Sequence, residues 1–358
     1  MRVLVAGAGP AGLYFSYLLK KRNPACELRV VEQNAAGSTF GFGVVFSDRA
    51  LEFLRGDDPA TYDLITPRME AWSDITVVHR GTPVVVDGIG FAAIGRLELL
   101  QLLQQQLASV GVVPEYEKPV VEEKGYDLVV AADGVNSTVR SRGDFGTTVS
   151  HLTNKFAWYG TPSVFGTLTQ TFVSNEHGAF NAHHYRHSPR MSTFVVECDA
   201  ATWQRAGFAA MGEPATIGYL ERLFGHRLVS NKSVWRNFPN LRNEKYFSGR
   251  TVLIGDALRT AHFSIGSGTR LAMEDAIALS KALSEQASID SALAAFEAAR
   301  RPIVEKLLAA ADASGAWYER FPEHMKLEPR EFAWSYIQRS GRVDPARLRK
   351  ISPKFVDG

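Results

Sequence analysis

The stretch VLVAGAGPAGL, residues 3–13, decides the fold of this chain. Its apolar start runs directly into glycines at the spacing GxGxxG, Gly7, Gly9 and Gly12, and the LYFSYLLKKR that follows predicts a helix. A second apolar segment, ELRVVE, ends in an acid, Glu32, twenty residues after Gly12. Strand, glycines, helix, strand and acid in this order form the complete pattern of a dinucleotide-binding βαβ unit.

The glycines and the acid of this motif each have a physical role in binding. Gly7 permits a tight turn, Gly9 lets a pyrophosphate approach the backbone, and Gly12 lets helix and strand pack closely. The helix N-terminus faces the phosphates, and Glu32 would accept hydrogen bonds from the adenosine ribose. The predicted cofactor-binding residues of this half are Gly7, Gly9, Pro10, Ala11, Gly12 and Glu32. The motif predicts a dinucleotide rather than a glycine turn that binds nothing, but it does not distinguish NAD from FAD.

Two further motifs lie far down the chain. DLVVAADGVNSTVR is a buried strand ending in Asp133 and Gly134, although an ordinary Asp–Gly turn is an equal alternative on this pattern alone. RTVLIGDA repeats the pattern and ends at Asp256. Beyond it, GSGTRLAMEDAIALSKAL has apolar residues at helical spacing. The residues that open this helix are Gly266, Ser267, Gly268 and Thr269.

The late motif favours FAD over NAD as the ligand. A helix N-terminus is partially positive, and a reduced flavin is anionic around N1 and O2. Asp256 is expected to bind ribityl hydroxyls or order water near the pyrophosphate, together with Arg96 from GRLELLQLL. The early and late motifs would then hold opposite ends of one extended molecule, which FAD is long enough to be.

These three motifs together, GAGPAG, DLVVAADGVNSTVR and GD followed by GxG after nine residues, resemble the FAD-dependent aromatic hydroxylases of the para-hydroxybenzoate hydroxylase type. The resemblance covers nearly the whole chain. It implies an α/β fold in which a Rossmann-like FAD-binding domain of the GR2 type contains an inserted, mostly antiparallel β-sheet substrate domain and ends in a helical segment. The expected FAD-binding domain comprises 1–70, 88–150 and 246–295, the substrate domain 71–87 and 151–245, and the C-terminal helical segment 296–358.

The resemblance also implies the activity. NAD(P)H would reduce FAD transiently, O2 would add at flavin C4a, and the resulting hydroperoxide would hydroxylate an aromatic substrate. FGFGVVFSD, STFVVEC and AHFSIGSGTRLAMED are most similar to hydroxylases of aryl-CoA thioesters such as salicylyl-CoA. Oxygenation of an indole-containing metabolite is the alternative within the class. A flavin-dependent reductase and a non-catalytic FAD-fold binding protein are alternatives outside it.

The chain departs from this family around the late motif. Where the family has prolines along the flavin edge, this chain has His262 and Phe263, and Arg270 replaces the usual Asn after GxG. We expect His262 to orient or deprotonate a hydroxyaromatic substrate and Arg270 to stabilise charge at flavin N1 and O2. A structural histidine beside a helix and a solvated arginine are the alternatives. The apolar substrate pocket is predicted to be lined by Phe42, Val44, Phe46, His262 and Phe263.

The middle of the chain predicts an antiparallel sheet with two clusters of interest. The first is His183, His184, Tyr185 and His187, but alternate strand residues face opposite sides and no Cys or carboxylate completes a ligand set, so no metal is expected. The second is a set of basic residues that either meet CoA phosphates or lie solvated at sheet edges. Its members are Arg49, Lys155, Arg186 and Arg190.

Composition excludes several other classes. A formal net charge of +2 over 358 residues argues against nucleic acid as a partner, and no apolar run reaches the ~18 residues of a membrane span. Only two cysteines occur, in no paired motif, which favours a reducing, cytoplasmic location. The expected partners are therefore a small aromatic substrate, O2 and NAD(P)H, and the chain is expected to be a monomer or a homodimer.

Overall fold

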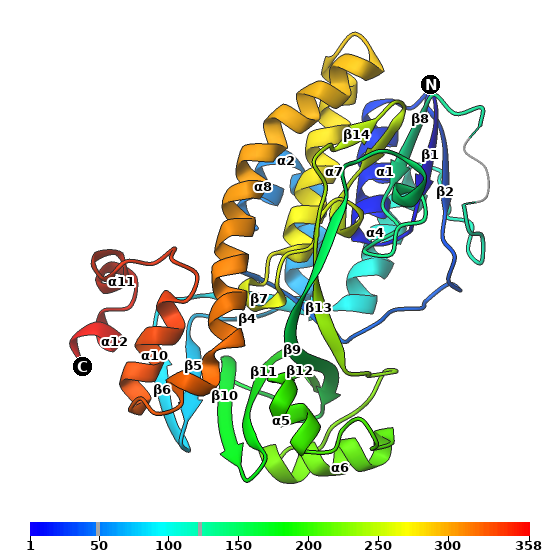
Figure 1. Cartoon of the computed structure of the whole chain (residues 1–358). Coiled ribbons are helices and arrows are strands. Elements are labelled where there is room, and N and C mark those ends of the chain that lie inside the picture. Colours follow the sequence, from blue (N-terminus) through cyan, green and yellow to red (C-terminus); the bar gives the residue numbers. More distant parts are fainter. Residues whose placement is uncertain (48–50, 121–123) are drawn as a thin grey trace.

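The computed structural model describes residues 1–47, 51–120 and 124–358. The half of the molecule that contains the GAGPAG loop, called the nucleotide-binding half below, is built on a five-stranded sheet with the order β14-β15-β8-β1-β2 (Figure 1). Neighbouring strands are parallel except β14 and β15 at the edge. The strands are β1 (Arg2–Ala6), β2 (Glu27–Val31), β8 (Leu128–Ala131), β14 (Phe247–Ser248) and β15 (Thr251–Leu253).

Helices bury this sheet because its strands are apolar on both sides. Every residue of β8 is buried, as is all of β1 after Arg2, which is the pattern of a parallel strand covered on both faces. Helix α1 (Pro10–Arg22) packs between α4 (Arg96–Ser109) and α7 (Gly268–Glu285). Short helices α2 (Glu52–Asp57) and α3 (Pro59–Ile65) and the 3₁₀ turn η2 (Thr66–Arg68) follow, and α3 contacts α4.

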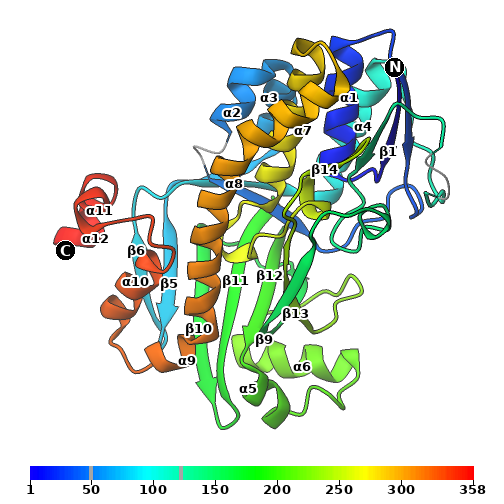
Figure 2. The same ribbon diagram turned by 45° about the horizontal axis from the view of Figure 1, so that its top comes forward.

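A seven-stranded sheet forms the second half of the molecule, in the order β13-β9-β12-β11-β10-β5-β6. All neighbours are antiparallel except β10 and β5, so the inserted sheet is mostly antiparallel as predicted. Figure 2 shows α5 (Ala200–Arg205) and α6 (Glu213–Phe224) beside this sheet. The strands are β5 (Ile75–His79), β6 (Thr82–Val86), β9 (Thr148–Thr161), β10 (Leu168–Asn175), β11 (Gly178–Ser188), β12 (Met191–Cys198) and β13 (Arg236–Arg242).

A small three-stranded sheet connects the two large ones. Its order is β3-β7-β4, with β3 (Gly43–Ser47), β7 (Phe91–Gly95) and β4 (Glu70–Trp72). Strand β7 leads directly into α4 of the nucleotide-binding half, and both β3 and β7 contact β11 of the large sheet. This sheet therefore lies where the two halves meet.

The C-terminal part of the chain is helical. Helix α8 (Ile289–Glu319) spans both halves, and its 31 residues correspond to a length of about 46 Å (Figures 1 and 2). The helices that follow are α9 (Phe321–His324), α10 (Pro329–Gln338), α11 (Pro345–Ile351) and α12 (Pro353–Asp357). They cover the β5–β6 hairpin, where Phe332 stacks on His79 with ring centroids 4.3 Å apart. Within the described residues, no helix is long and apolar enough to cross a membrane.

Candidate active site

The GAGPAG loop has the backbone that its glycines were expected to provide. Gly7 has a φ of +100°, and a Cβ added there would lie 2.4 Å from the carbonyl oxygen of Ala132. A Cβ on Gly12 would lie 2.0 Å from the carbonyl oxygen of Gly7. Gly9 differs, because a Cβ there would meet nothing within 4 Å. Gly7 and Gly12 are thus required for packing, whereas Gly9 leaves open space at the N-terminus of α1.

Glu32 is fixed beside this loop at the end of β2. Its Oε2 accepts a hydrogen bond from the Ala8 N–H at 2.9 Å, and its Oε1 accepts one from the Asn34 N–H at 2.9 Å. The half-buried carboxylate retains further acceptor capacity on each oxygen. Its place, next to the first turn of α1, fits the contact with an adenosine ribose that was predicted for it.

The early and late motifs meet in space. A Cβ added to Gly255, whose φ is +62°, would lie 3.0 Å from the Cβ of Ala11. Next to it, Asp256 lies near Arg96 at the start of α4. Desolvation by the surrounding protein raises the pKa of Asp256, and the Arg96 guanidinium lowers it. Two segments 244 positions apart, at 11 and 255, therefore line one continuous region.

Asp133 and Gly134 follow β8, which ends at Ala131, beside the GAGPAG loop. The Asp133 Oδ2 accepts hydrogen bonds from the N–H groups of Thr138 at 2.8 Å and Val139 at 3.3 Å, which fixes the turn. Its Oδ1 is buried and has no hydrogen-bond partner among the described residues. This free acceptor is available to a bound hydroxyl or water.

A buried ion network holds the late motif in place. Asp275 of α7 has 0% exposure and accepts a hydrogen bond from the Gly255 N–H at 3.0 Å. It pairs with Arg259 at 2.5 Å and with Arg300 of α8 at 2.9 Å. The turn that presents Asp256 is therefore tied to both long helices.

This network extends to Arg270. Arg300 pairs with Glu274 at 2.9 Å, and Glu274 pairs with Arg270 at 2.7 Å. The guanidinium of Arg270 lies one turn after Gly266 and is partly exposed. Its orientation is set by a carboxylate that is itself buried.

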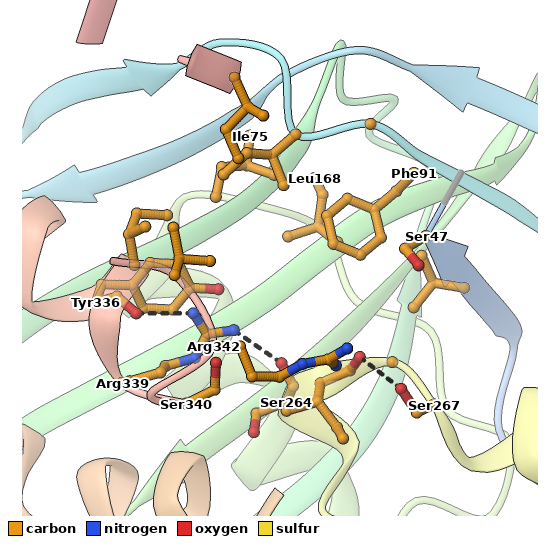
Figure 3. A pocket seen from close by; sticks show the side chains of 18 of the residues that line it. Ser47, Ile75, Phe91, Leu168, Ser264, Ser267, Tyr336, Arg339, Ser340 and Arg342 are labelled. Atoms are coloured by element: carbon orange, nitrogen blue, oxygen red, sulfur yellow. Dashed lines mark hydrogen bonds between the residues drawn. The ribbon is translucent and has the colours of Figure 1, made fainter. Parts of the chain in front are cut away.

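A cavity of about 300 Å³ adjoins the GxG loop where the sheets meet. Figure 3 shows Ile75, Leu168 and Phe91 along one wall, and the serines and arginines along the opposite wall. Gly266 borders it, and a Cβ added to Gly266 would lie 3.0 Å from Cγ1 of Val45. The polar wall comprises Ser264, Ser267, Arg270, Arg339, Ser340 and Arg342, with Arg347 nearby in the lining.

His183 is a buried ionisable side chain in the lining of this cavity. It is 4% exposed, and neither ring nitrogen has a hydrogen-bond partner among the residues that the structure describes. Burial lowers the pKa of His183 to about 3, with a smaller contribution from Arg339. The imidazole is therefore neutral near pH 7 and offers the cavity one donor and one acceptor.

Comparison with known proteins agrees with this geometry. Residues 104–311 match the family described as an FAD binding domain. Salicyloyl-CoA 5-hydroxylase of a Streptomyces species is 42% identical, over 100% of this chain and 73% of that protein. Protodeoxyviolaceinate monooxygenase of Chromobacterium violaceum is 35% identical over 96% of each chain. 3-Hydroxy-4-methyl-anthranilyl-[aryl-carrier protein] 5-monooxygenase of Streptosporangium sibiricum is 36% identical over 90% of each chain.

The chain is an FAD-dependent aromatic monooxygenase. A solved structure of 2-methyl-3-hydroxypyridine-5-carboxylic acid oxygenase has the same fold, with a TM-score of 0.75 at 19% identity over 97% of this chain and 95% of that one. The predicted family, fold class, enzyme class and FAD cofactor are thereby confirmed.

The cavity of this monooxygenase is lined by other residues of β3 than those predicted. Val44 and Phe46 lie in the core of the nucleotide-binding half, and Val45 and Ser47 line the cavity instead. The period of two is as expected for a strand, but the phase is reversed. Phe42, also predicted, packs on β9, where a Cβ added to Gly160 would lie 2.5 Å from its ring.

His262 and Phe263 do not line this cavity either. His262 borders a second cavity against α8, and Phe263 packs on Phe156 with centroids 5.0 Å apart. Ser264 and Ile265 do line the first cavity, so the chain changes direction between Phe263 and Ser264. His262 is linked to the first cavity through Ser264, whose Oγ lies 2.7 Å from the His262 Nδ1.

The remaining candidates of the sheet lie away from the cavity. His184 packs on Phe194 on the opposite face from His183. Within the described ranges, no group of three or more His, Cys, Asp or Glu side chains is arranged to hold a metal ion. Lys155 donates to Asn237 at 2.6 Å, and Arg186 pairs with Glu70 at 2.9 Å. Arg190 is exposed and Arg49 lies outside the described residues.

Proposed function

We propose that this monooxygenase hydroxylates the aromatic ring of an aryl-CoA thioester. The observation that carries the proposal is the cavity beside Gly266, which combines an apolar wall, an unpartnered neutral His183 and a basic side. An aromatic ring would pack on the apolar wall, its hydroxyl group would meet His183, and a phosphorylated carrier attached to the ring would meet the basic side. The 42% identical relative acts on salicyloyl-CoA, and a second relative acts on an aryl group held by a carrier protein.

The residues of the early and late motifs fit bound FAD. Glu32 would hold the adenosine ribose, the open side of Gly9 would admit the pyrophosphate, and Asp133 and Asp256 would bind hydroxyls or ordered water. Arg96 has a buried Nε without a partner among the described residues, which favours a bound anion beside it. Gly266 to Thr269 at the N-terminus of α7 would contact the isoalloxazine. When bound, FAD supplies the chemistry of O2 activation after reduction by NAD(P)H.

The chain's own side chains would then position the ring and exclude water. His183 would accept a hydrogen bond from the ring hydroxyl through a neutral imidazole nitrogen. Ile75, Phe91 and Leu168 would cover the ring faces and keep water away from it. Arg270 would add positive charge near the GxG loop, with Glu274 fixing its orientation.

His262 would act at one remove, through Ser264. The Ser264 Oγ lies 2.7 Å from both the His262 Nδ1 and the Ser314 Oγ, and Ser264 itself lines the cavity. His262 would therefore be a positioning residue that sets the direction of the Ser264 hydroxyl, and Phe263 would support its ring at a centroid distance of 4.3 Å.

The cellular setting belongs to the same proposal. Both cysteines, Cys26 and Cys198, are free and buried, as expected in a reducing compartment such as the cytoplasm. The enzyme would work there as a monomer or a homodimer, with an aryl-CoA, O2 and NAD(P)H as its reactants.

The test is NAD(P)H oxidation by the FAD-loaded enzyme in air, with salicylyl-CoA and a free indole offered separately. The thioester alone should stimulate oxidation and gain one oxygen atom by mass. Stimulation by the indole alone would instead support the activity that the violacein-pathway relative suggests. His183→Leu should lower kcat on the thioester by roughly 10- to 100-fold, and His183→Gln by less, because Gln retains a hydrogen-bond acceptor.

A further inference from the structure

Four arginines line the cavity, and three of them come from the C-terminal helical segment. They are Arg270 of α7 and Arg339, Arg342 and Arg347, which follow or lie within α10 and α11. Arg270 is paired with Glu274. The other three form no ion pair with any residue in the described part of the chain, although each lies in the cavity lining.

These three arginines differ in how deeply they are buried in the cavity wall. Arg339 is half-buried and fixed, since it donates to the carbonyl oxygens of Tyr336 at 2.8 Å and Ser264 at 2.9 Å and stacks 3.8 Å from the Tyr336 ring centroid. Arg342 and Arg347 are exposed. Figure 3 shows Arg339 and Arg342 on the wall opposite Ile75 and Leu168.

The positive charges repel one another. Arg270, Arg342 and Arg347 line one cavity, and within the described residues only Arg270 of these three has a carboxylate partner. Like charges that converge on a cavity destabilise the protein unless an anion binds there. One carboxylate would neutralise a single guanidinium, so three arginines without a carboxylate partner among the described residues match a ligand with several negative charges.

We propose that Arg342 and Arg347, supported by Arg339, bind the phosphate groups of the CoA part of the substrate. This inference rests on the proposed function and adds the site of the phosphates to it. The sheet residues that the sequence offered for this role are engaged elsewhere, because Lys155 donates to Asn237 and Arg186 pairs with Glu70. The aromatic ring would lie inside, near His183, and the phosphates at the exposed arginines.

The test compares a double variant, Arg342→Gln with Arg347→Gln, against the matched control Arg349→Gln. Arg349 lies in the same helix α11 and pairs with the exposed Asp357, but it does not line the cavity. Each FAD-loaded enzyme is assayed with salicylyl-CoA and with salicylyl-pantetheine, which lacks phosphates. The double variant should raise KM for the CoA thioester by roughly five- to tenfold and change KM for the pantetheine thioester less than twofold.

A second readout does not depend on turnover. Free CoA should bind the wild-type enzyme in calorimetry, more weakly at higher ionic strength, and the double variant should lose most of this binding while Arg349→Gln retains it. Equal KM values for salicylyl-CoA in the wild type and the double variant would overturn the site but leave the proposed function intact. Equal losses with both thioesters would also overturn it, since they indicate a structural role. Failure of the wild type to oxidise either thioester would overturn the proposed function itself.

Discussion

Glu197 on β12 shows how burial can determine the charge of a side chain in this enzyme. Its Oε1 accepts a hydrogen bond from Asn154 Nδ2 at 2.9 Å, and its Oε2 has no partner among the described residues. Desolvation is the main cause that raises the pKa of Glu197 to about 8; the hydrogen bond from Asn154 opposes this shift and the nearby Glu319 adds to it. The carboxyl group is therefore mostly protonated at neutral pH.

This pKa predicts a pH-dependent effect of Glu197→Gln. Because the folded-state pKa is raised above the unfolded value of 4.5, the stability that the protonated group contributes is complete below pH 4.5 and is lost as pH rises through about 8. Gln mimics the protonated form at every pH. The variant should match the wild type at pH 5 and be more stable by about 1–3 kcal/mol at pH 9, measured by urea unfolding. A difference that is the same at both pH values would contradict this assignment.

At the scale of elements, different glycines of the GAGPAG loop serve packing and ligand binding, Gly12 the first and Gly9 the second. Gly12→Ala should prevent stable folding, since its Cβ would lie 2.0 Å from the Gly7 carbonyl oxygen. Gly9→Ala should fold with nearly unchanged melting temperature but bind FAD at least roughly tenfold more weakly, because its methyl group would enter the space left for the pyrophosphate. Thermal melts and flavin fluorescence titration distinguish the two effects. Unchanged FAD affinity in Gly9→Ala would place the pyrophosphate elsewhere.

The contact of the late turn with α7 and α8 depends on Asp275. Asp275→Asn would leave Arg259, whose side chain is 3% exposed, without a carboxylate partner among the described residues, and Arg300, which is 5% exposed, with Glu274 alone. Loss of one partner of a buried ion pair typically costs about 3–5 kcal/mol, and we expect a decrease of that size in the free energy of unfolding. Glu285→Gln on the same helix, whose exposed pair with Lys281 is 3.9 Å long, serves as the control and should cost less than about 0.5 kcal/mol.

The elements that the sequence predicted well are those specified by local pattern. Glycines with special backbone angles, such as Gly7, and the acid at the end of β2, Glu32, follow from short-range spacing and lie where they were expected. The phase of β3 was not predicted correctly. GVVFS is apolar at consecutive positions, so alternation alone cannot decide whether Val44 or Val45 faces the cavity. The direction of His262 depends on the 3₁₀ turn Phe263–Ile265 that follows it, which the pattern did not specify.

The arginines of the C-terminal segment were missed for a different reason. Arg342 and Arg347 reach the cavity because α10 packs against β5 and β6 and α12 packs against β6, strands that lie far earlier in the chain. No local periodicity encodes such a contact. From the sequence, His183 was considered only as a metal ligand. It lies two residues before Tyr185 on β11 and therefore on the same face of the sheet, and this spacing could have marked it as a cavity residue.

At the scale of the whole molecule, the cofactor should act as a clamp between distant segments. Glu32, Arg96 and Asp256 come from three separated parts of the chain, and the two opposing charges at Arg96 and Asp256 lie near each other. A ligand that contacts all three should stabilise the fold by mass action, by about 2.7 kcal/mol at an FAD concentration 100 times its Kd. Melting temperatures of the enzyme with and without added FAD measure this gain. Equal melting temperatures would show that FAD does not bind across these segments.

The contact between β6 and the last helices can form only late in translation, because the two segments are far apart in the sequence. The Phe355 N–H donates to the side chain of Asp87 at 2.9 Å, and Phe355 follows Asp87 by 268 residues in the sequence. Helices α10 and α12 cover the edge strand β6. At about 5–20 residues per second, translation needs roughly 13–54 s to supply that cover. During this time the nascent hairpin presents an open strand edge to other chains. The nucleotide-binding half is synthesised before the wall of the substrate cavity is complete, so a polypeptide still being translated can acquire its flavin before it can acquire its substrate.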